Sequence, residues 1–375
     1  MSEPTSKTVP LSIPTVSASA SRYLQECLDT GWVSTAGPFV KRFEDEVRQY
    51  TGSPFAVATA SGTAALHLAY LTAGIGPASV VLVPTLSFIA TANAVAYLGA
   101  RCCFVDCEPA TWNISRDTVR DALAWARADG LSPTHVVATH LYGVPVEIEG
   151  LLELCDAEGL TLVEDAAESL GSWYAGRHTG RFGRNAALSF NGNKIITTGA
   201  GGMLLTGDEQ IARHARHLST QARTDARYYL HDEIGYNYRL SNLHAALGVS
   251  QLEDLPDLRK RRRAIQDVYL GTLGDLAWLT PQARPSTADV NGWLFSATVG
   301  PSAPLSRDEV LKHLDAAGIE ARPVFEPIHR LPMYSKLGGA CPQADEIART
   351  GLSLPNSPTS DEHRVCAALH AIGLP

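Results

Sequence analysis

The sequence predicts an α/β fold in which a mostly parallel central sheet is covered on both faces by helices, giving three layers. The first observation is a series of short apolar runs, each followed by a polar or glycine-containing turn and then by a helical pattern. Runs of this kind suit strands that are buried on both faces of a sheet. They lie at residues 55–58, 80–83, 136–139, 161–163 and 187–190.

The second observation is that helical patterns separate these runs, at residues 64–72, 90–97, 115–128 and 150–158. A strand, a helix and a further strand in this order form a crossover connection, which makes the two strands parallel. Open α/β sheets bind ligands beyond the carboxyl ends of their strands. Functional side chains are therefore expected directly after the apolar runs.

The third observation is a change of composition near residue 253. The segment LEDLPDLRKRRRAIQDVYL is typical of a charged helix, and the residues after it are rich in proline. In a chain of 375 residues this predicts a large domain at residues 1–252 and a smaller C-terminal α+β domain at residues 253–375. We interpret the basic run at residues 259–263 as a solvated helix face rather than a nucleic-acid patch.

Composition excludes several classes of function. The net charge of -8 disfavours binding to a phosphate backbone, so we expect no nucleic-acid partner. The seven cysteines form an odd number without a CxxC pair, which favours a reducing cytoplasm over a disulfide framework or a zinc site. We expect no metal and no metal hydrolase, because the candidate ligands have no recognised spacing: His214, His217, Cys102, Cys103 and Cys107.

One uncharged stretch, residues 49–99, raises the question of a membrane span. Proline, glycine and polar residues interrupt it, so we interpret it as protein interior. The first residues carry prolines where a signal peptide would have an unbroken apolar run. We expect a cytoplasmic protein without a membrane segment.

The segment AVATASGTAALHLAYL carries the first candidate binding site. Ser61, Gly62 and Thr63 stand between an apolar strand and a helix. Free amide groups at a helix N-terminus, with a glycine that permits close approach, form an anion site that suits a phosphate. The alternative is that Ser61 or Thr63 only caps the helix.

The second candidate is Asp165, in TLVEDAAESLGSWYAG, directly after a predicted buried strand. A carboxylate at that position must face a cation or a hydrogen-bond donor, because burying it alone costs several kcal/mol. The alternative is a solvent-facing turn residue. Glu164 is predicted to point away from Asp165, whereas Glu168 lies about one helical turn further and can share its face.

The third candidate is Lys194, in ALSFNGNKIITTGAGGMLLTGD, a segment rich in glycine and otherwise uncharged up to its final aspartate. A lysine in such surroundings loses its proton readily, and a neutral amine can form a Schiff base. The alternative is a surface lysine on a hairpin loop.

Together these candidates match the needs of pyridoxal phosphate, which requires a lysine, a carboxylate against the ring nitrogen and a phosphate cup. Lys194 and Asp165 supply the first two, and they follow successive predicted strands. Ser189, five residues before the lysine, adds a phosphate ligand, and Phe88 offers an aromatic cover for the ring.

Several motifs, in this order, resemble the DegT/DnrJ/StrS family of sugar aminotransferases. They are SGTAALHLA, PTLSFIATANAV, HLYGVP, EDAAESLGS, SFNGNKIITTGAGG, GYNYRLSNLHAALGVSQL and RPVFEPIHRLPMY. The resemblance extends from residue 31 to the region of His329. It implies a pyridoxal phosphate enzyme of fold type I, usually a homodimer in which both subunits contribute to each active site.

The resemblance also implies roles for individual residues. Lys194 would hold the cofactor and move the proton, Asp165 would pair with the ring nitrogen, and Glu168 would lie near the ring hydroxyl. The implied phosphate ligands are Gly62, Thr63, Ser189 and, from the neighbouring subunit, Asn242, and Phe88 would stack on the ring. The implied substrate contacts are Arg239 and His329.

The segment NGNKIITTG resembles the sequences of the family branch that makes UDP-4-amino-4,6-dideoxy-N-acetylhexosamines. The implied reaction moves an amino group from L-glutamate, by way of pyridoxamine phosphate, to the 4-keto carbon of a nucleotide-linked 6-deoxy sugar, with ping-pong kinetics. Alternatives are a GDP- or dTDP-linked 4-keto or 3-keto sugar as substrate, and a non-catalytic regulatory homologue that binds the cofactor. A related dehydratase, which has histidine in place of the lysine, is disfavoured by Lys194.

Overall fold

A computed structural model describes residues 8–225, 227–335 and 338–372. Its centre is a seven-stranded sheet with the order β1-β9-β8-β5-β4-β2-β3. The strands are β1 (Phe55–Thr59), β2 (Val80–Pro84), β3 (Arg101–Val105), β4 (Pro133–Thr139), β5 (Thr161–Asp165), β8 (Asn185–Ser189) and β9 (Gly202–Thr206). The five strands predicted from apolar runs are all present, at β1, β2, β4, β5 and β8.

The sheet is mostly parallel, as predicted. The neighbouring pairs among β8, β5, β4, β2 and β3 are parallel, whereas β9 runs antiparallel to both β1 and β8. The strands β3 and β9 were missed by the sequence analysis. The apolar run of β9, Met203–Leu205, directly follows a glycine-rich segment that predicts a turn, so the run was not recognised as a strand.

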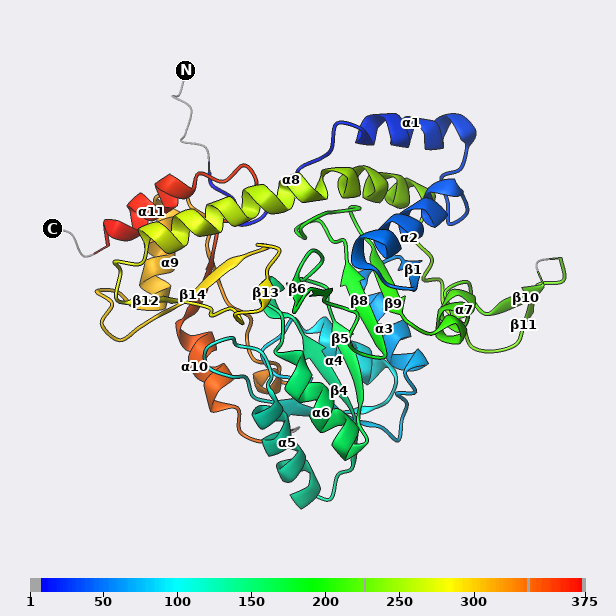
Figure 1. Ribbon diagram of the computed structural model, residues 1–375, viewed down its shortest axis with the longest axis horizontal. Helices are drawn as coiled ribbons and strands as arrows, with labels where there is room; N and C mark the ends of the chain where they lie inside the picture. The colour runs from blue at the N-terminus through cyan, green and yellow to red at the C-terminus, as the bar shows by residue number, and fades with distance from the viewer. Residues whose placement is uncertain (1–7, 226, 336–337, 373–375) are drawn as a thin grey trace.

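Helices cover both faces of this sheet, which makes the three layers (Figure 1). One face packs against α3 (Gly62–Thr72), α4 (Ala90–Tyr97) and α7 (Glu209–Leu218). The other face packs against α2 (Pro38–Thr51), α5 (Arg116–Ala128), α6 (Ile148–Glu158) and the first half of α8 (Asn242–Thr272), with α1 (Ala20–Thr30) outside them. Alternate residues of each strand enter opposite cores, as the two-residue period of a strand requires: Val81 and Val83 face one, and Leu82 faces the other.

The C-terminal part contains a second, antiparallel sheet with the order β12-β14-β16-β15. Its strands are β12 (Leu279–Pro281), β14 (Phe295–Val299), β15 (Arg322–Pro323) and β16 (Gly351–Leu354). The second half of α8, together with α9 (Arg307–Ala316) and α11 (Glu362–His370), forms the core against it. Helix α10 (Pro342–Thr350) precedes β16.

The long helix α8 joins the two parts of the chain (Figure 1). It passes through the predicted domain boundary at residue 253 without a break. The interpretation of its basic run as a solvated face is wrong. Arg262 is buried and donates to the carbonyl groups of Trp293 and Asn356, while Arg261 pairs with Glu362 at 2.8 Å. The basic run therefore ties α8 to the C-terminal part.

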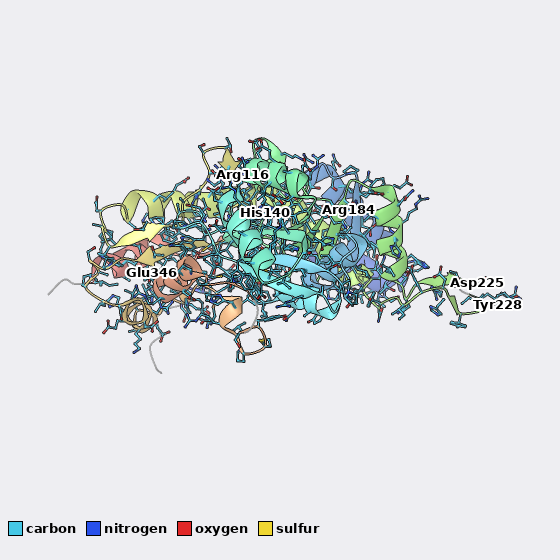
Figure 2. All side chains as sticks on the ribbon, turned by 90° about the horizontal axis from the view of Figure 1, so that it is seen from below. Arg116, His140, Arg184, Asp225, Tyr228 and Glu346 are labelled. Atoms are coloured by element: carbon cyan, nitrogen blue, oxygen red, sulfur yellow. The ribbon has the colours of Figure 1, made fainter. Side chains whose placement is uncertain are left out.

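Smaller elements complete the described chain. They are β6 (Trp173–Tyr174), β7 (Arg177–His178), β13 (Ala288–Asp289), the 3₁₀ turns η1 (Leu141–Gly143) and η2 (Ile328–Arg330), and the two-stranded hairpin β10 (Arg223–Asp225) and β11 (Leu230–His231). The hairpin projects from the body of the protein, with Asp225 and Tyr228 near its tip (Figure 2). Within the described residues, every helix is too short or too polar to cross a bilayer.

Candidate active site

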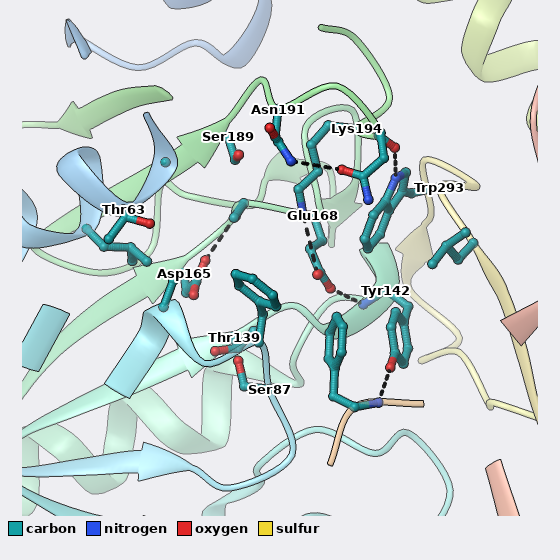
Figure 3. Close-up of a pocket in the computed structure, with 18 of the residues that line it drawn as sticks. Thr63, Ser87, Thr139, Tyr142, Asp165, Glu168, Ser189, Asn191, Lys194 and Trp293 are labelled. Carbon is teal, nitrogen blue, oxygen red and sulfur yellow. Dashed lines mark hydrogen bonds and ion pairs between the residues drawn. The ribbon is translucent and has the colours of Figure 1, made fainter. Parts of the chain in front are cut away.

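A cavity of about 420 Å³ lies at the carboxyl ends of β1, β2, β4, β5 and β8. This is the edge at which open α/β sheets bind ligands. Seven residues proposed from the sequence line it: Gly62, Thr63, Phe88, Asp165, Glu168, Ser189 and Lys194. Figure 3 shows the side chains of Thr63, Asp165, Glu168, Ser189 and Lys194 around this cavity.

The first turn of α3 forms one wall of the cavity. Ser61 is the N-cap residue and its Oγ accepts a hydrogen bond from the Ala64 amide at 3.1 Å. The amide groups of Gly62 and Thr63 precede the first intrahelical donors and are free for a ligand. A Cβ atom on Gly62 would lie 2.7 Å from the Ser189 Cβ, so glycine is required for this close approach. Ser61 thus caps the helix, and the helix end still faces the cavity.

Asp165 ends β5 with a buried carboxylate. Its Oδ2 accepts a hydrogen bond from the Thr91 hydroxyl at 2.6 Å, and its Oδ1 accepts one from the Ala167 amide at 3.1 Å. Thr91 also lies 2.8 Å from the Ser87 hydroxyl. Burial raises the pKa of Asp165, and the Thr91 hydrogen bond opposes that rise. A cation brought to this carboxylate would replace the hydration that burial has removed.

Glu164 points to the opposite side of β5, as the strand geometry predicts. Its carboxylate accepts hydrogen bonds from the amides of Gly180, Phe182 and Gly183 at 2.6 to 2.7 Å, and it pairs with His140 at 3.0 Å. These partners lower the pKa of Glu164 although burial opposes them. Glu164 therefore has a structural role, and it holds the segment that leads into η1.

Lys194 reaches the cavity from the loop after β8 (Figure 3). Its Nζ lies 3.4 Å from Oε1 of Glu168 and 4.1 Å from the centre of the Trp293 ring. The Trp293 indole is fixed in turn by donating to the Asn193 carbonyl at 2.7 Å. Burial raises the pKa of Glu168, and the charge of Lys194 opposes this. The side chain of Lys194 therefore points into the cavity and does not lie on the protein surface.

Tyr142 connects this cluster to the C-terminal part. Its backbone is left-handed (φ 55°, ψ 22°), a conformation that costs about 1–3 kcal/mol in a residue other than glycine. Its amide donates to Glu168 Oε2 at 2.8 Å, and its hydroxyl accepts from the Phe325 amide at 2.9 Å. These two hydrogen bonds hold the strained residue in place, and Phe325 itself lines the cavity.

Three predicted residues lie outside the cavity. Asn242 is buried and uses its amide inside its own chain: Oδ1 accepts from the Phe39 amide, and Nδ2 donates to the Trp32 carbonyl and to the Cys27 sulfur. Within its own chain both donor hydrogens have partners, and the expected contact with a neighbouring subunit's phosphate stays a prediction. Asn242 fastens the start of α8 to the segment before α2.

Arg239 and His329 also have partners within their own chain, and their expected contacts with the substrate stay predictions. Arg239 forms an ion pair with the buried Glu44 at 2.9 Å. His329 has its Nδ1 2.7 Å from the Thr85 hydroxyl and its Nε2 3.4 Å from Asp345. Neither side chain lines the cavity. Both residues fasten segments that border the site.

Sequence reasoning missed several cavity residues and their supports. They are Thr91, Thr139, Tyr142, Trp293 and Arg322. Thr91 and Tyr142 lie within motifs that carry the family resemblance, so attention to polar groups one helical turn away from Phe88 would have found Thr91. Trp293 and Arg322 come from segments about 100 residues or more beyond Lys194, and no local pattern marks them.

Comparison with known proteins establishes the family. The model of the DegT/DnrJ/EryC1/StrS aminotransferase family matches residues 14–371. The chain belongs to this family. The sequence-based expectation of a pyridoxal phosphate-dependent sugar aminotransferase of this fold is thereby confirmed.

Individual relatives of this aminotransferase match over nearly its whole length. EpsN of Bacillus subtilis (strain 168), assigned as a pyridoxal phosphate-dependent aminotransferase, is 38% identical over 95% of this chain and 92% of its own. GDP-perosamine synthase of Escherichia coli O157:H7 is 36% identical over 96% of both chains. The crystal structure of the aminotransferase TlmJ from Streptoalloteichus hindustanus superposes with a TM-score of 0.88 at 29% identity, covering 98% of this chain and 100% of that one.

The cavity of this aminotransferase fits pyridoxal phosphate. The free helix end at Gly62 and Thr63 suits the phosphate, and the buried Asp165 needs a cationic partner. The hydroxyl of Thr139, which also lines the cavity, is buried and has no hydrogen-bond partner within the described residues. Such a buried orphan next to Asp165 is expected where a bound group supplies the partner.

Proposed function

We propose that the enzyme transfers an amino group from L-glutamate to the 4-keto carbon of a GDP-linked 4-keto-6-deoxy sugar. The observation that carries the choice of nucleotide is the similarity to GDP-perosamine synthase, at 36% identity over 96% of both chains. The UDP-N-acetylhexosamine branch suggested by NGNKIITTG does not follow from the relatives. The nucleotide therefore changes from UDP to GDP in this proposal, and the reaction type stays the same.

Two residues divide the chemistry between them. When bound, pyridoxal phosphate withdraws electrons from the carbon that carries the amino group. Lys194 Nζ, 3.4 Å from Glu168, is the group that takes a proton from one carbon and returns it to another. Asp165 would hold the ring nitrogen of the bound cofactor by its negative charge, which would favour the protonated ring.

The surroundings of Lys194 orient its amine. Glu168 attracts the charged form, and the Trp293 ring face lies 4.1 Å from Nζ. Because both contacts are strongest for the ammonium, they direct the amine toward one side of the cavity whenever it holds a proton. Glu168 is itself held by the Tyr142 amide at 2.8 Å, so the orientation depends on a residue of η1.

Arg322 is our candidate for binding the anionic part of the substrate. Among the described residues that line the cavity, the cationic side chains are Lys194 and Arg322. A nucleotide-linked sugar carries a diphosphate, and L-glutamate carries two carboxylates, so both substrates need such a group. The guanidinium of Arg322 pairs with Glu320 at 2.6 Å on the exposed rim, where a substrate anion can compete for it.

We also propose a homodimer. The hairpin β10–β11 and the residues after it expose large apolar side chains, with Tyr228, Tyr229 and Ile234 65%, 75% and 85% accessible. Exposed apolar groups gathered on a projecting arm favour a protein partner. The same chain then returns beside the cavity, because the Ala60 amide donates to the Tyr238 carbonyl one residue before the N-cap of α3. A second copy is the partner that would bring this arm near an active site.

The test uses a panel of 4-keto-6-deoxy sugars linked to GDP, UDP and dTDP, with 3-keto isomers, and L-glutamate as donor. We expect the highest kcat/KM with a GDP-linked 4-keto sugar and parallel double-reciprocal plots, the pattern of a ping-pong reaction. Higher kcat/KM with a UDP-linked sugar would overturn the choice of nucleotide but not the reaction type.

The Lys194→Ala variant tests the reaction type. It should lose the visible absorption band of the bound cofactor and all turnover, whereas Lys312→Ala, a change of an exposed lysine on α9, should lose neither. A borohydride-reducible covalent adduct that persists in Lys194→Ala would refute the assignment of this lysine.

A further inference from the structure

Two histidines and two carboxylates meet at the base of the projecting hairpin. His214 and His217 lie on α7, and Asp232 and Glu233 directly follow β11. His217 Nε2 lies 2.7 Å from Asp232 Oδ1 and 3.8 Å from Glu233 Oε1. His214 Nε2 lies 2.9 Å from the same Glu233 oxygen. Both imidazoles therefore present Nε2 to Glu233, and that of His217 also faces Asp232.

The separations match what a small divalent cation requires. In a tetrahedral zinc site with bonds of about 2.0–2.2 Å, neighbouring ligand atoms lie about 3.4 Å apart. The observed values of 2.7, 2.9 and 3.8 Å bracket that spacing. One possible ligand atom from each of His217, Asp232 and Glu233 lies within 4.8 Å of the others. His214 is outside this group of three and reaches it through Glu233, so it becomes the fourth ligand only after its side chain turns toward His217 and Asp232.

The backbone holds both halves of the cluster together. His214 and His217 are three positions apart and share one face of α7, whereas Ala215 between them is buried in the core. The chain that follows the hairpin is bonded to the end of α7, since the Tyr236 amide donates to the Leu218 carbonyl at 2.7 Å. The ligand groups are thus brought together by the fold and not by chance contact of two mobile side chains.

We propose that His214, His217, Asp232 and Glu233 form a binding site for a divalent transition-metal ion of the zinc class. Two neutral imidazoles and two carboxylates carry a charge of −2, which neutralises such an ion. Nitrogen ligands select zinc, nickel or cobalt over magnesium, which prefers oxygen ligands only. No metal is expected from the sequence, because its histidines and cysteines have no recognised ligand spacing, and the two carboxylates stand 15 or more positions beyond the histidines.

The ion has a structural role at this place. It joins α7 to Asp232 and Glu233, which directly follow β11. It therefore restricts the movement of the hairpin that carries Tyr228 and Tyr229. The site lies outside the catalytic cavity, and none of its four ligands lines that cavity. We therefore expect the ion to order the arm and to leave the chemistry at Lys194 unchanged.

Isothermal titration of the full-length, tag-free holoenzyme with ZnCl₂ tests the site. We expect one ion per chain for the wild type, more than about 100-fold weaker binding for His214→Gln/His217→Gln, and unchanged binding for His363→Gln, an exposed histidine on α11. MgCl₂ should give no comparable binding. Asp232→Asn/Glu233→Gln should reproduce the loss, which guards against a defect peculiar to the histidine variant.

Limited trypsin digestion adds a readout that is independent of activity. Cleavage after Arg227, in the hairpin, should be slowed by zinc in the wild type and in His363→Gln, and it should be insensitive to zinc in the double-histidine variant. The same comparison corrects for any effect of zinc on trypsin. Equal zinc affinity in the wild type and the double-histidine variant, absence of binding to the wild type, or equal protection of Arg227 in both proteins would overturn the proposal.

Discussion

The hydrogen bond from Thr91 to Asp165 offers the most direct test of how the site is built. The Thr91→Val substitution keeps the shape of the side chain and removes the hydroxyl that donates to Asp165 Oδ2 at 2.6 Å. Both residues are buried, with Thr91 fully inaccessible, so water cannot easily replace the lost donor. The carboxylate then keeps the Ala167 amide as its remaining donor within the described chain.

The expected magnitude follows from the type of bond. A hydrogen bond to a charged group contributes about 1.5–3 kcal/mol, and one pKa unit corresponds to about 1.4 kcal/mol. Burial already raises the pKa of Asp165, and Thr91 opposes this, so removing Thr91 should raise that pKa further. An ionised Asp165 is needed, so activity should be lost at a higher pH as the solution is acidified.

The assay is the pH profile of kcat/KM, which reports ionisations of the free enzyme. The acid limb of Thr91→Val should move upward by about one to two pH units relative to the wild type. Thr206→Val removes a buried hydroxyl on β9 that donates to the Arg184 carbonyl, far from Asp165 along the sheet, and it should leave the limb in place. An unmoved acid limb in Thr91→Val, with the protein folded, would refute the link between this hydroxyl and the carboxylate.

Three further predictions concern the cofactor site and stability. Asp165→Asn should retain bound cofactor but lose about 100-fold or more in kcat, since an amide cannot hold the ring proton by charge; wild-type turnover would contradict this. Gly62→Ala would place a Cβ 2.7 Å from Ser189 Cβ, so the affinity for the cofactor, measured by absorbance, should fall about 10- to 100-fold. Unchanged affinity would show that the phosphate of the cofactor binds elsewhere. Burial lowers the pKa of His178 to about 3, so below about pH 6.5 the unfolded state binds a proton at this residue and the folded state does not. Unfolding free energy in urea should therefore fall as pH drops below about 6.5, by up to about 1.4 kcal/mol per unit, and His178→Gln should reduce this slope; equal slopes would disprove the role of His178.

Part of the active site was accessible from sequence because the chemistry lies at strand ends. Asp165 and the Gly62 turn each follow an apolar run, Ser189 ends β8, and the mostly parallel sheet brings such ends to one edge. Lys194 was found by the same reasoning, although it lies five residues beyond the strand. The residues that orient it were not, because Trp293 and Tyr142 reach the cavity through loops whose paths depend on the packing of α8 and the C-terminal sheet.

Three residues to which the family resemblance assigned roles lie outside the cavity, and those roles stay predictions. Asn242, Arg239 and His329 stand in matching motifs, yet each is committed to internal partners: the Trp32 carbonyl, Glu44 and the Thr85 hydroxyl. A motif specifies a neighbourhood in the chain, but a side chain's direction depends on which donors and acceptors the folded protein brings within reach. The basic run on α8 likewise could not be placed from the sequence alone. Arg262 is buried because the folded chain brings the carbonyl groups of Trp293 and Asn356 beside it.

The sequence by itself determined the layered α/β architecture and the meeting of Lys194, Asp165 and the Gly62 turn at one edge of the sheet, because apolar runs and helical patterns are local and strand ends are ordered by topology. Only the tertiary structure decided the hydrogen bond from Thr91, the contacts of Glu168 with Lys194 and Tyr142, and the meeting of α7 with the acidic residues after β11. Those contacts join segments that are distant in the chain, and their geometry arises from packing that no local pattern records.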